Sequence, residues 1–141
     1  MNINYHGAGI LFYHIDKKGE VFVLLGKKSY AGKEWSIFGG GWEKKDGYYN
    51  DEKNLLKTAV RETQEEVGIT VPLSVPKKIW EKKIPFYSWE TYVVGLKNKL
   101  FIKRFSPEIA RVGWFNIDRL PDRCYPSLYP QIEIIRSRLK K

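Results

Sequence analysis

The chain has 141 residues, of which 43% are hydrophobic and 15% aromatic, enough for the core of one domain covering residues 1–141. A formal net charge of +9 favours anionic partners such as nucleotides, nucleic acid or phosphorylated metabolites, although many proteins are basic for solubility alone. The single cysteine, Cys124, excludes an internal disulfide and is expected to pack in the core. With no apolar leader or span, these features predict a cytoplasmic protein without a membrane partner.

Strands are predicted first near the N-terminus. The apolar stretches GAGILFYHI (7–15) and EVFVLLG (20–26) flank the turn-like DKKG and are expected to pair. Further strand candidates are KKIWEKKIPFY (77–87), ETYVVGL (90–96) and RVGWFNI (111–117).

A first helix is predicted from about Asp51 to Val67. Its apolar stripe consists of residues spaced by four, three and four positions, namely Leu56, Val60, Thr63 and Val67. Asn50 or Asp51 can cap its start, and Gly68 stands where a left-handed residue ends a helix.

A second helix is predicted in SLYPQIEIIRSRLKK (127–141), with Pro130 in its first turn or just before it. Its apolar face would contain Ile132, Ile135 and Leu139. Strands, a helix, more strands and a final helix predict a mixed α+β layered domain.

The stretch RETQEEVGI (61–69) groups three acids on the first helix. Glu62 and Glu66 are one turn apart with Glu65 beside them, and all three are expected to avoid the apolar stripe. Like charges at this spacing repel by a few tenths of a kcal/mol, a cost that a divalent cation such as Mg²⁺ or Mn²⁺ would remove. An ordinary solvated helix face is the alternative interpretation.

Three consecutive glycines follow a short apolar strand in EWSIFGGGWE (34–43). At such a place the backbone must either turn sharply or approach a ligand closely.

This glycine stretch and the acidic helix together resemble the Nudix hydrolase family (MutT-like). The family signature is a glycine, five residues, Glu, seven residues, then Arg-Glu-apolar-x-Glu-Glu-x-Gly-apolar. Its second half matches closely here, with Thr63 at an apolar position, through Arg61, Glu62, Glu65, Glu66, Gly68 and Ile69.

The first half of the signature departs from the pattern. If WSIFGG matches the usual Trp-x-apolar-Pro-Gly-Gly, Phe38 replaces the proline and Gly40 is the signature glycine. Twenty residues then separate Gly40 from Arg61 where the pattern has thirteen, and we assign the extra seven to KKDGYYNDE (44–52), a possible specificity loop. The first glutamate would fall at Lys53; either Glu52 takes that role after a one-residue slip, or Lys53 impairs metal binding.

The resemblance implies an α/β/α sandwich around a mixed sheet, and Mg²⁺- or Mn²⁺-dependent cleavage of the pyrophosphate linkage of a nucleoside diphosphate derivative. It implies that Arg61 orients the neighbouring glutamates. One glutamate, or Glu108 in the loop before the last strand, would accept a proton from the attacking water. The implied metal ligands are the Gly40 carbonyl, Glu52, Glu62, Glu65 and Glu66.

Other residues near this site are candidates for substrate contacts. Lys27 and Lys28 could reach substrate phosphates from a strand end, and Gly39 and Gly40 leave the backbone open to the substrate. An aromatic side chain near the glycines could stack on a nucleobase, and the candidates are Trp42, Tyr48 and Tyr49. Trp35 is better explained by core packing, and His6 and His14 lack metal-ligand spacing and are interpreted as structural.

Two other functions stay open. The first is a Nudix-fold protein that binds nucleotides or a partner without turnover. The second, supported only by charge and aromatic content, is a small nucleic-acid-binding domain. Nucleic acid is otherwise expected only as a 5′-phosphorylated substrate, and neither the nucleoside derivative nor the oligomeric state follows from the sequence.

Overall fold

The computed structural model describes residues 4–30, 32–51 and 53–139. The strands are β1 (Tyr5–Ile15), β2 (Val21–Lys28), β3 (Trp35–Ser36), β4 (Phe38–Gly41), β5 (Lys77–Ile84), β6 (Tyr87–Gly95) and β7 (Ile109–Asn116). The helices are α1 (Asn54–Val67), α2 (Leu128–Leu139) and the short 3₁₀ helix η1 (Lys44–Asp46). No helix in the described ranges is long and apolar enough to cross a membrane.

The strands form one mixed sheet with the order β3-β2-β1-β6-β5, to which β4 is added along β1 and β7 along β2. β1 and β6 run parallel, and the other pairs are antiparallel. The predicted pairing of the first two strands is confirmed, with Tyr13 opposite Val23. β1 has eleven residues, so it pairs with β4 over its first half and with β2 at its end.

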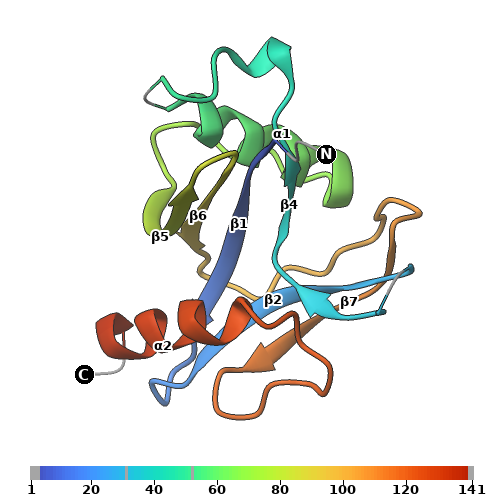
Figure 1. The fold of residues 1–141 in the computed structure, drawn as a ribbon. Helices are drawn as coiled ribbons and strands as arrows, with labels where there is room; N and C mark the ends of the chain where they lie inside the picture. The colour runs from blue at the N-terminus through green and yellow to red at the C-terminus, as the bar shows by residue number, and fades with distance from the viewer. Residues whose placement is uncertain (1–3, 31, 52, 140–141) are drawn as a thin grey trace.

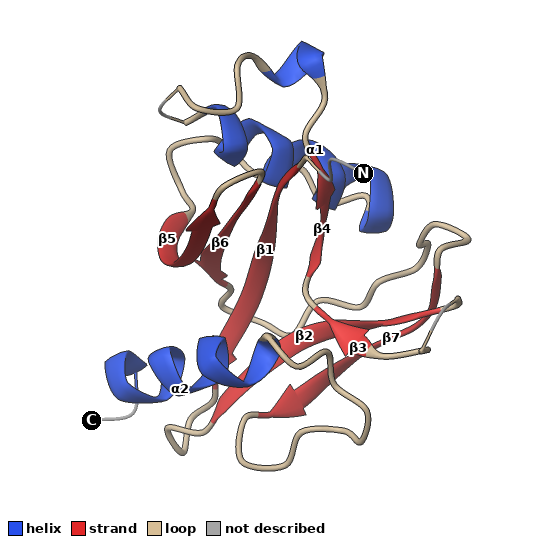
Figure 2. Ribbon diagram, viewed as in Figure 1, coloured by secondary structure: helices blue, strands red, loops and turns tan. Residues whose placement is uncertain are grey.

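The two long helices lie on opposite faces of this sheet (Figures 1 and 2). Side chains alternate along β1 accordingly: Ala8, Ile10 and Phe12 are buried in the cluster that contains the apolar residues of α1. Leu11 is buried in the second cluster, with α2 and Cys124. The α/β/α sandwich around a mixed sheet is therefore confirmed.

The first helix begins later than predicted. Its N-terminal flanking residue is Lys53, in the left-handed conformation with φ 71°, and no side chain caps the helix there, so the prediction of Asn50 or Asp51 as the cap is wrong. Gly68 ends the helix with φ 74°, as predicted. α2 carries Pro130 in its first turn, where a missing N–H is tolerated.

The three glycines do not make a sharp turn. Gly39, Gly40 and Gly41 belong to β4 and pair with Gly9, Ala8 and Gly7 of β1. A Cβ atom added to Gly39 would lie 2.5 Å from the Ala8 carbonyl oxygen, so this position accepts no side chain. The sharp turn is therefore wrong, and the close approach seen at Gly39 is to the neighbouring strand β1.

Candidate functional site

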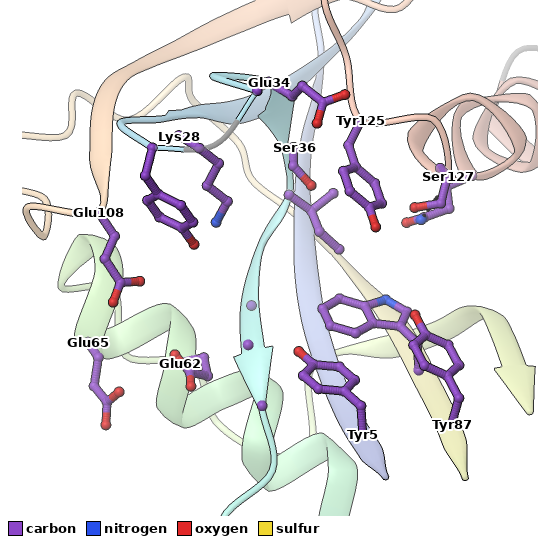
Figure 3. A pocket seen from close by; sticks show the side chains of 18 of the residues that line it. Tyr5, Lys28, Glu34, Ser36, Glu62, Glu65, Tyr87, Glu108, Tyr125 and Ser127 are labelled. Carbon is purple, nitrogen blue, oxygen red and sulfur yellow. Dashed lines mark hydrogen bonds between the residues drawn. The ribbon is translucent and has the colours of Figure 1, made fainter. Parts of the chain in front are cut away.

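A pocket of about 690 Å³ opens beside β4 (Figure 3). Glu62, Glu65 and Glu108 lie on one side of it, and Tyr5, Tyr87 and Tyr125 lie across from them, with Glu34 beside Tyr125. The residues predicted from the sequence that line this pocket are Lys28, Gly39, Gly40, Glu62, Glu65 and Glu108.

Arg61 ties the acidic side of the pocket together from α1. Its Nη1 donates to Glu62 Oε1 and to both carboxylate oxygens of Glu65, each at 3.3 Å. Its Nη2 donates to the Gly41 carbonyl oxygen at 2.9 Å, which links α1 to β4. The predicted contact between Arg61 and its neighbouring glutamates is therefore present.

The strongest partner of Arg61 is Asp46, which the sequence analysis missed. Arg61 Nε donates to Oδ1 at 3.0 Å and Nη2 to Oδ2 at 2.9 Å, a bidentate pair. Thr58 Oγ1 donates to the same carboxylate at 2.8 Å, and Asp46 is only 5% exposed. Burial raises the pKa of Asp46, but the hydrogen bonds from Arg61 and Thr58 outweigh it, and the pKa lies below its ordinary value.

Asp46 also changes the register assigned to the signature. It stands six positions after Gly40, which is where the pattern places its first acid. Counting back from Arg61 gives Lys53 instead, which lies exposed at the start of α1. The extra residues therefore follow Asp46, while Glu52 lies outside the described residues.

The carboxylate of Glu62 lies against the backbone of Gly40. A Cβ atom added to Gly40 would lie 2.5 Å from Glu62 Cδ and 2.6 Å from Oε1. Burial, followed by the charges of Glu65 and Glu108, raises the pKa of Glu62, although Arg61 opposes this rise. The glycine thus lets a helix carboxylate approach the strand, and the acids nearby repel one another.

Glu66 is buried together with the apolar residues of α1, which corrects the expectation that all three glutamates avoid the apolar stripe. It is 4% exposed, and its Oε1 accepts from the Gly39 N–H at 2.7 Å. Lys28 Nζ lies 3.5 Å from Oε2. Burial raises the pKa of Glu66 to about 7, while Lys28 lowers it. Glu65, by contrast, is 46% exposed.

The two lysines proposed for phosphate contacts differ in position. Lys28 lines the pocket, whereas Lys27, its neighbour on β2, does not. Adjacent strand residues point to opposite faces, which accounts for the difference. Glu108 comes from the turn before β7 and reaches the pocket beside Glu62 and Glu65 (Figure 3).

The aromatic side of the pocket comes from distant segments of the chain and was not predicted. The aromatic residues that line the pocket are Tyr5, Tyr30, Trp80, Tyr87, Trp89 and Tyr125, of which Tyr5, Tyr87 and Tyr125 lie across from Glu62 and Glu65 (Figure 3). The rings of Tyr5 and Tyr87 stack with centroids 5.8 Å apart. Burial, then the charge of Tyr87, raises the pKa of Tyr5 to about 12, so its hydroxyl stays protonated at neutral pH.

The aromatic candidates for base stacking have structural contacts instead. Tyr49 stacks on His6 with centroids 3.5 Å apart and meets Trp42 edge-on. None of Trp42, Tyr48 and Tyr49 lines the pocket. Trp35 is buried and packs edge-on against Phe115, which confirms its assignment to the core.

Comparisons with known proteins agree with this architecture. The model of the NUDIX domain family matches residues 5–133. A search of curated proteins found no match. Among solved structures, the chain resembles a Caenorhabditis elegans Ap4A hydrolase in a binary complex, with 20% identity over 96% of this chain and 98% of that one and a TM-score of 0.71.

Two further structures extend the comparison. The NUDIX domain of Shewanella oneidensis NrtR, complexed with ADP ribose, has a TM-score of 0.73 and 16% identity over 99% of this chain and 90% of that one. A MutT/nudix family protein from Enterococcus faecalis has a TM-score of 0.64 and 16% identity over 79% of this chain, which spans only 43% of that protein. Because the family model covers most of the sequence, this protein belongs to the Nudix family.

Proposed function

We propose that this protein is a hydrolase that uses Mg²⁺ or Mn²⁺ to cleave the pyrophosphate linkage of a nucleoside diphosphate derivative. One arrangement carries the proposal: Arg61 holds Glu62 and Glu65 beside Glu108, at one side of a pocket whose other side is aromatic. Charged phosphates and a planar base would occupy these two sides. The Ap4A hydrolase and the domain complexed with ADP ribose support this substrate class.

The acids fit a divalent cation by their chemistry. No group of three or more Asp, Glu, His and Cys side chains is arranged to hold a metal ion in the described parts of the chain. Mg²⁺, however, usually binds one or two carboxylates and completes its shell with water and substrate phosphates. Glu62, Glu65 and the Gly40 carbonyl would hold the ion. Glu66 would become a further ligand if its carboxylate gave up the contact with Lys28 and bound the metal. Bound there, the ion would neutralise charge that develops on the phosphate oxygens.

The protein's own side chains would then position the metal-binding carboxylates and the substrate phosphate, and one of them would deprotonate the attacking water. Arg61 restrains Glu62 and Glu65, whose mutual repulsion would otherwise separate them. Lys28 places an ammonium group in the pocket, where a substrate phosphate can replace its contact with Glu66. Glu108 or one of the helix glutamates would accept the proton of the attacking water.

A substrate panel tests the proposal. It includes nucleoside di- and triphosphates, dinucleoside polyphosphates, nucleotide sugars and 5′-triphosphate RNA, each with Mg²⁺ and with Mn²⁺. Glu65→Gln and Glu108→Gln should each lower kcat by about 10² or more without unfolding the protein. Glu133→Gln, at an exposed position on α2, is the matched control.

The alternative functions predict different results. If nothing on the panel is hydrolysed but calorimetry detects nucleotide binding, the protein is a binding member of its family. If random oligonucleotides bind tightly and in a salt-sensitive way instead, the nucleic-acid-binding hypothesis replaces both.

A further inference from the structure

Gln131, on the buried side of α2, carries an unpaired acceptor atom at the edge of the pocket. Its side chain is 2% exposed and lines the pocket together with Ser127. Gln131 Oε1 has no hydrogen-bond partner among the residues that the structure describes. Buried polar atoms nearly always have a partner, so this one calls for an explanation.

The orientation of the Gln131 side-chain amide is determined by its nitrogen, Nε2. Gln131 Nε2 donates to the backbone carbonyl oxygen of Ser127 at 2.9 Å. A carbonyl oxygen can only accept, so the amide cannot be rotated to exchange its nitrogen and oxygen without losing this bond. The atom left over is an acceptor, and its partner must therefore be a donor.

The surroundings of Gln131 suit a planar ring. Tyr87, Tyr125 and Ser127 lie away from Glu62 and Glu65, whereas Tyr5 lies between Tyr87 and Glu62 (Figure 3).

Trp89 contributes a fixed aromatic surface at this end. Cβ atoms added to Gly7 and Gly9 would lie 2.9 and 3.1 Å from its indole ring, so these glycines make room for it. Trp89 Nε1 already donates to Thr91 Oγ1 at 2.8 Å. Stacking on such rings accepts every base, because every base has an aromatic face, so it gives little discrimination.

We propose that this end of the pocket binds a nucleobase that carries an exocyclic amino group, and that Gln131 Oε1 accepts a hydrogen bond from that group. This inference rests on the proposed function for the identity of the ligand as a nucleoside derivative. Adenine, guanine and cytosine carry such a group, whereas uracil, hypoxanthine and unsubstituted purine do not. Gln131 is thus a specificity-determining residue, remote from the acids that would hold the metal.

The test compares substrates that differ only in the amino group. Nucleoside 5′-diphosphoribose compounds of adenosine and purine riboside form one pair, those of guanosine and inosine a second, and those of cytidine and 2-pyrimidinone riboside a third. Wild-type kcat/KM should be about tenfold higher for the amino member of at least one pair, as one net hydrogen bond allows. In Gln131→Leu that ratio should fall to about one, whereas the exposed Gln64→Leu should keep it.

The design separates this inference from the proposed function. Turnover of any member of the pairs tests hydrolysis. The ratio of kcat/KM within a pair tests Gln131, because a general loss of activity lowers both members of the pair equally. If nothing is turned over, the same ratios are measured as dissociation constants by calorimetry. A wild-type ratio near one for all three pairs, or an unchanged ratio in a folded Gln131→Leu, overturns the inference; if that variant does not fold, the wild-type ratios decide.

Discussion

Replacing Asp46 by asparagine tests whether this residue anchors the acidic site. The variant keeps the shape of the side chain but removes its negative charge, and it leaves one acceptor oxygen where Arg61 now donates to two, at 3.0 and 2.9 Å. A hydrogen bond to a charged group contributes about 1.5–3 kcal/mol. Because Arg61 retains Gly41, Glu62 and Glu65, we expect a loss of about 2 kcal/mol, less than the 3–5 kcal/mol of a fully broken buried pair.

Urea unfolding followed by tryptophan fluorescence measures this loss. The midpoint should fall with an unchanged m-value, and the melting temperature should fall by about 7 °C for a chain of this size. Asp51→Asn, an exposed carboxylate in the same loop, is the matched control and should change stability by less than about 0.5 kcal/mol.

The pH dependence of the difference between wild type and variant sharpens the test. Since the folded pKa of Asp46 lies below its unfolded value, its contribution is fully present above the unfolded pKa of about 3.9. It is lost as pH falls through the folded pKa. The stability gap between wild type and Asp46→Asn should therefore narrow below about pH 4. A loss no greater than that of Asp51→Asn, or a gap that stays constant into acid, would refute the reasoning.

Three further perturbations bear on the site. Gly40→Ala should displace Glu62, because the new Cβ would lie 2.5 Å from its carboxylate carbon, and kcat should fall at least about tenfold. The control is Gly41→Ala, whose Cβ would meet nothing closer than 3.6 Å; Gly40→Ala should be the less stable of the two variants. Chelation of divalent ions should abolish turnover, and Mg²⁺ should restore it. Mg²⁺ at 100 times its dissociation constant should also stabilise the wild type by about 2.7 kcal/mol in thermal melts, and the effect should shrink in Glu62→Gln.

Much of the fold could be predicted because it depends on local patterns. Apolar stretches rich in β-branched and aromatic residues located β1, β2, β6 and β7, and a helical stripe located α1 to within three residues at its start. The start itself was misplaced because Lys53 adopts a left-handed conformation there, which nothing in its residue type indicates.

Helical spacing predicts only the part of the site that lies on one element, whereas Gly40 and Glu108 were expected from the family resemblance. Glu62 and Glu65 follow from helical spacing, yet the burial of Glu66 does not, because its partner is the backbone N–H of Gly39 on another element. Every residue except proline has a backbone N–H, so the residue types alone do not show which N–H will bind a carboxylate. Likewise, the aromatic side joins Tyr5, Tyr87 and Tyr125, which are adjacent only because β1 pairs in parallel with β6 and the segment before α2 folds over them.

The register of the signature shows why the lengthened segment follows Asp46. The path from Gly40 to Asp46 is fixed by the pairing of β4 with β1 and by η1, so an insertion there would move the carboxylate away from Arg61. Residues 47–60, by contrast, number fourteen where the pattern has seven. Residues 54–60 belong to α1, so the extra length falls in the segment before this helix, and closing a loop costs only about 0.6 kcal/mol more for each doubling of its length. That cost is smaller than the roughly 2 kcal/mol that we assign to the Asp46–Arg61 pair. The chain can therefore lengthen after the acid and keep the site intact.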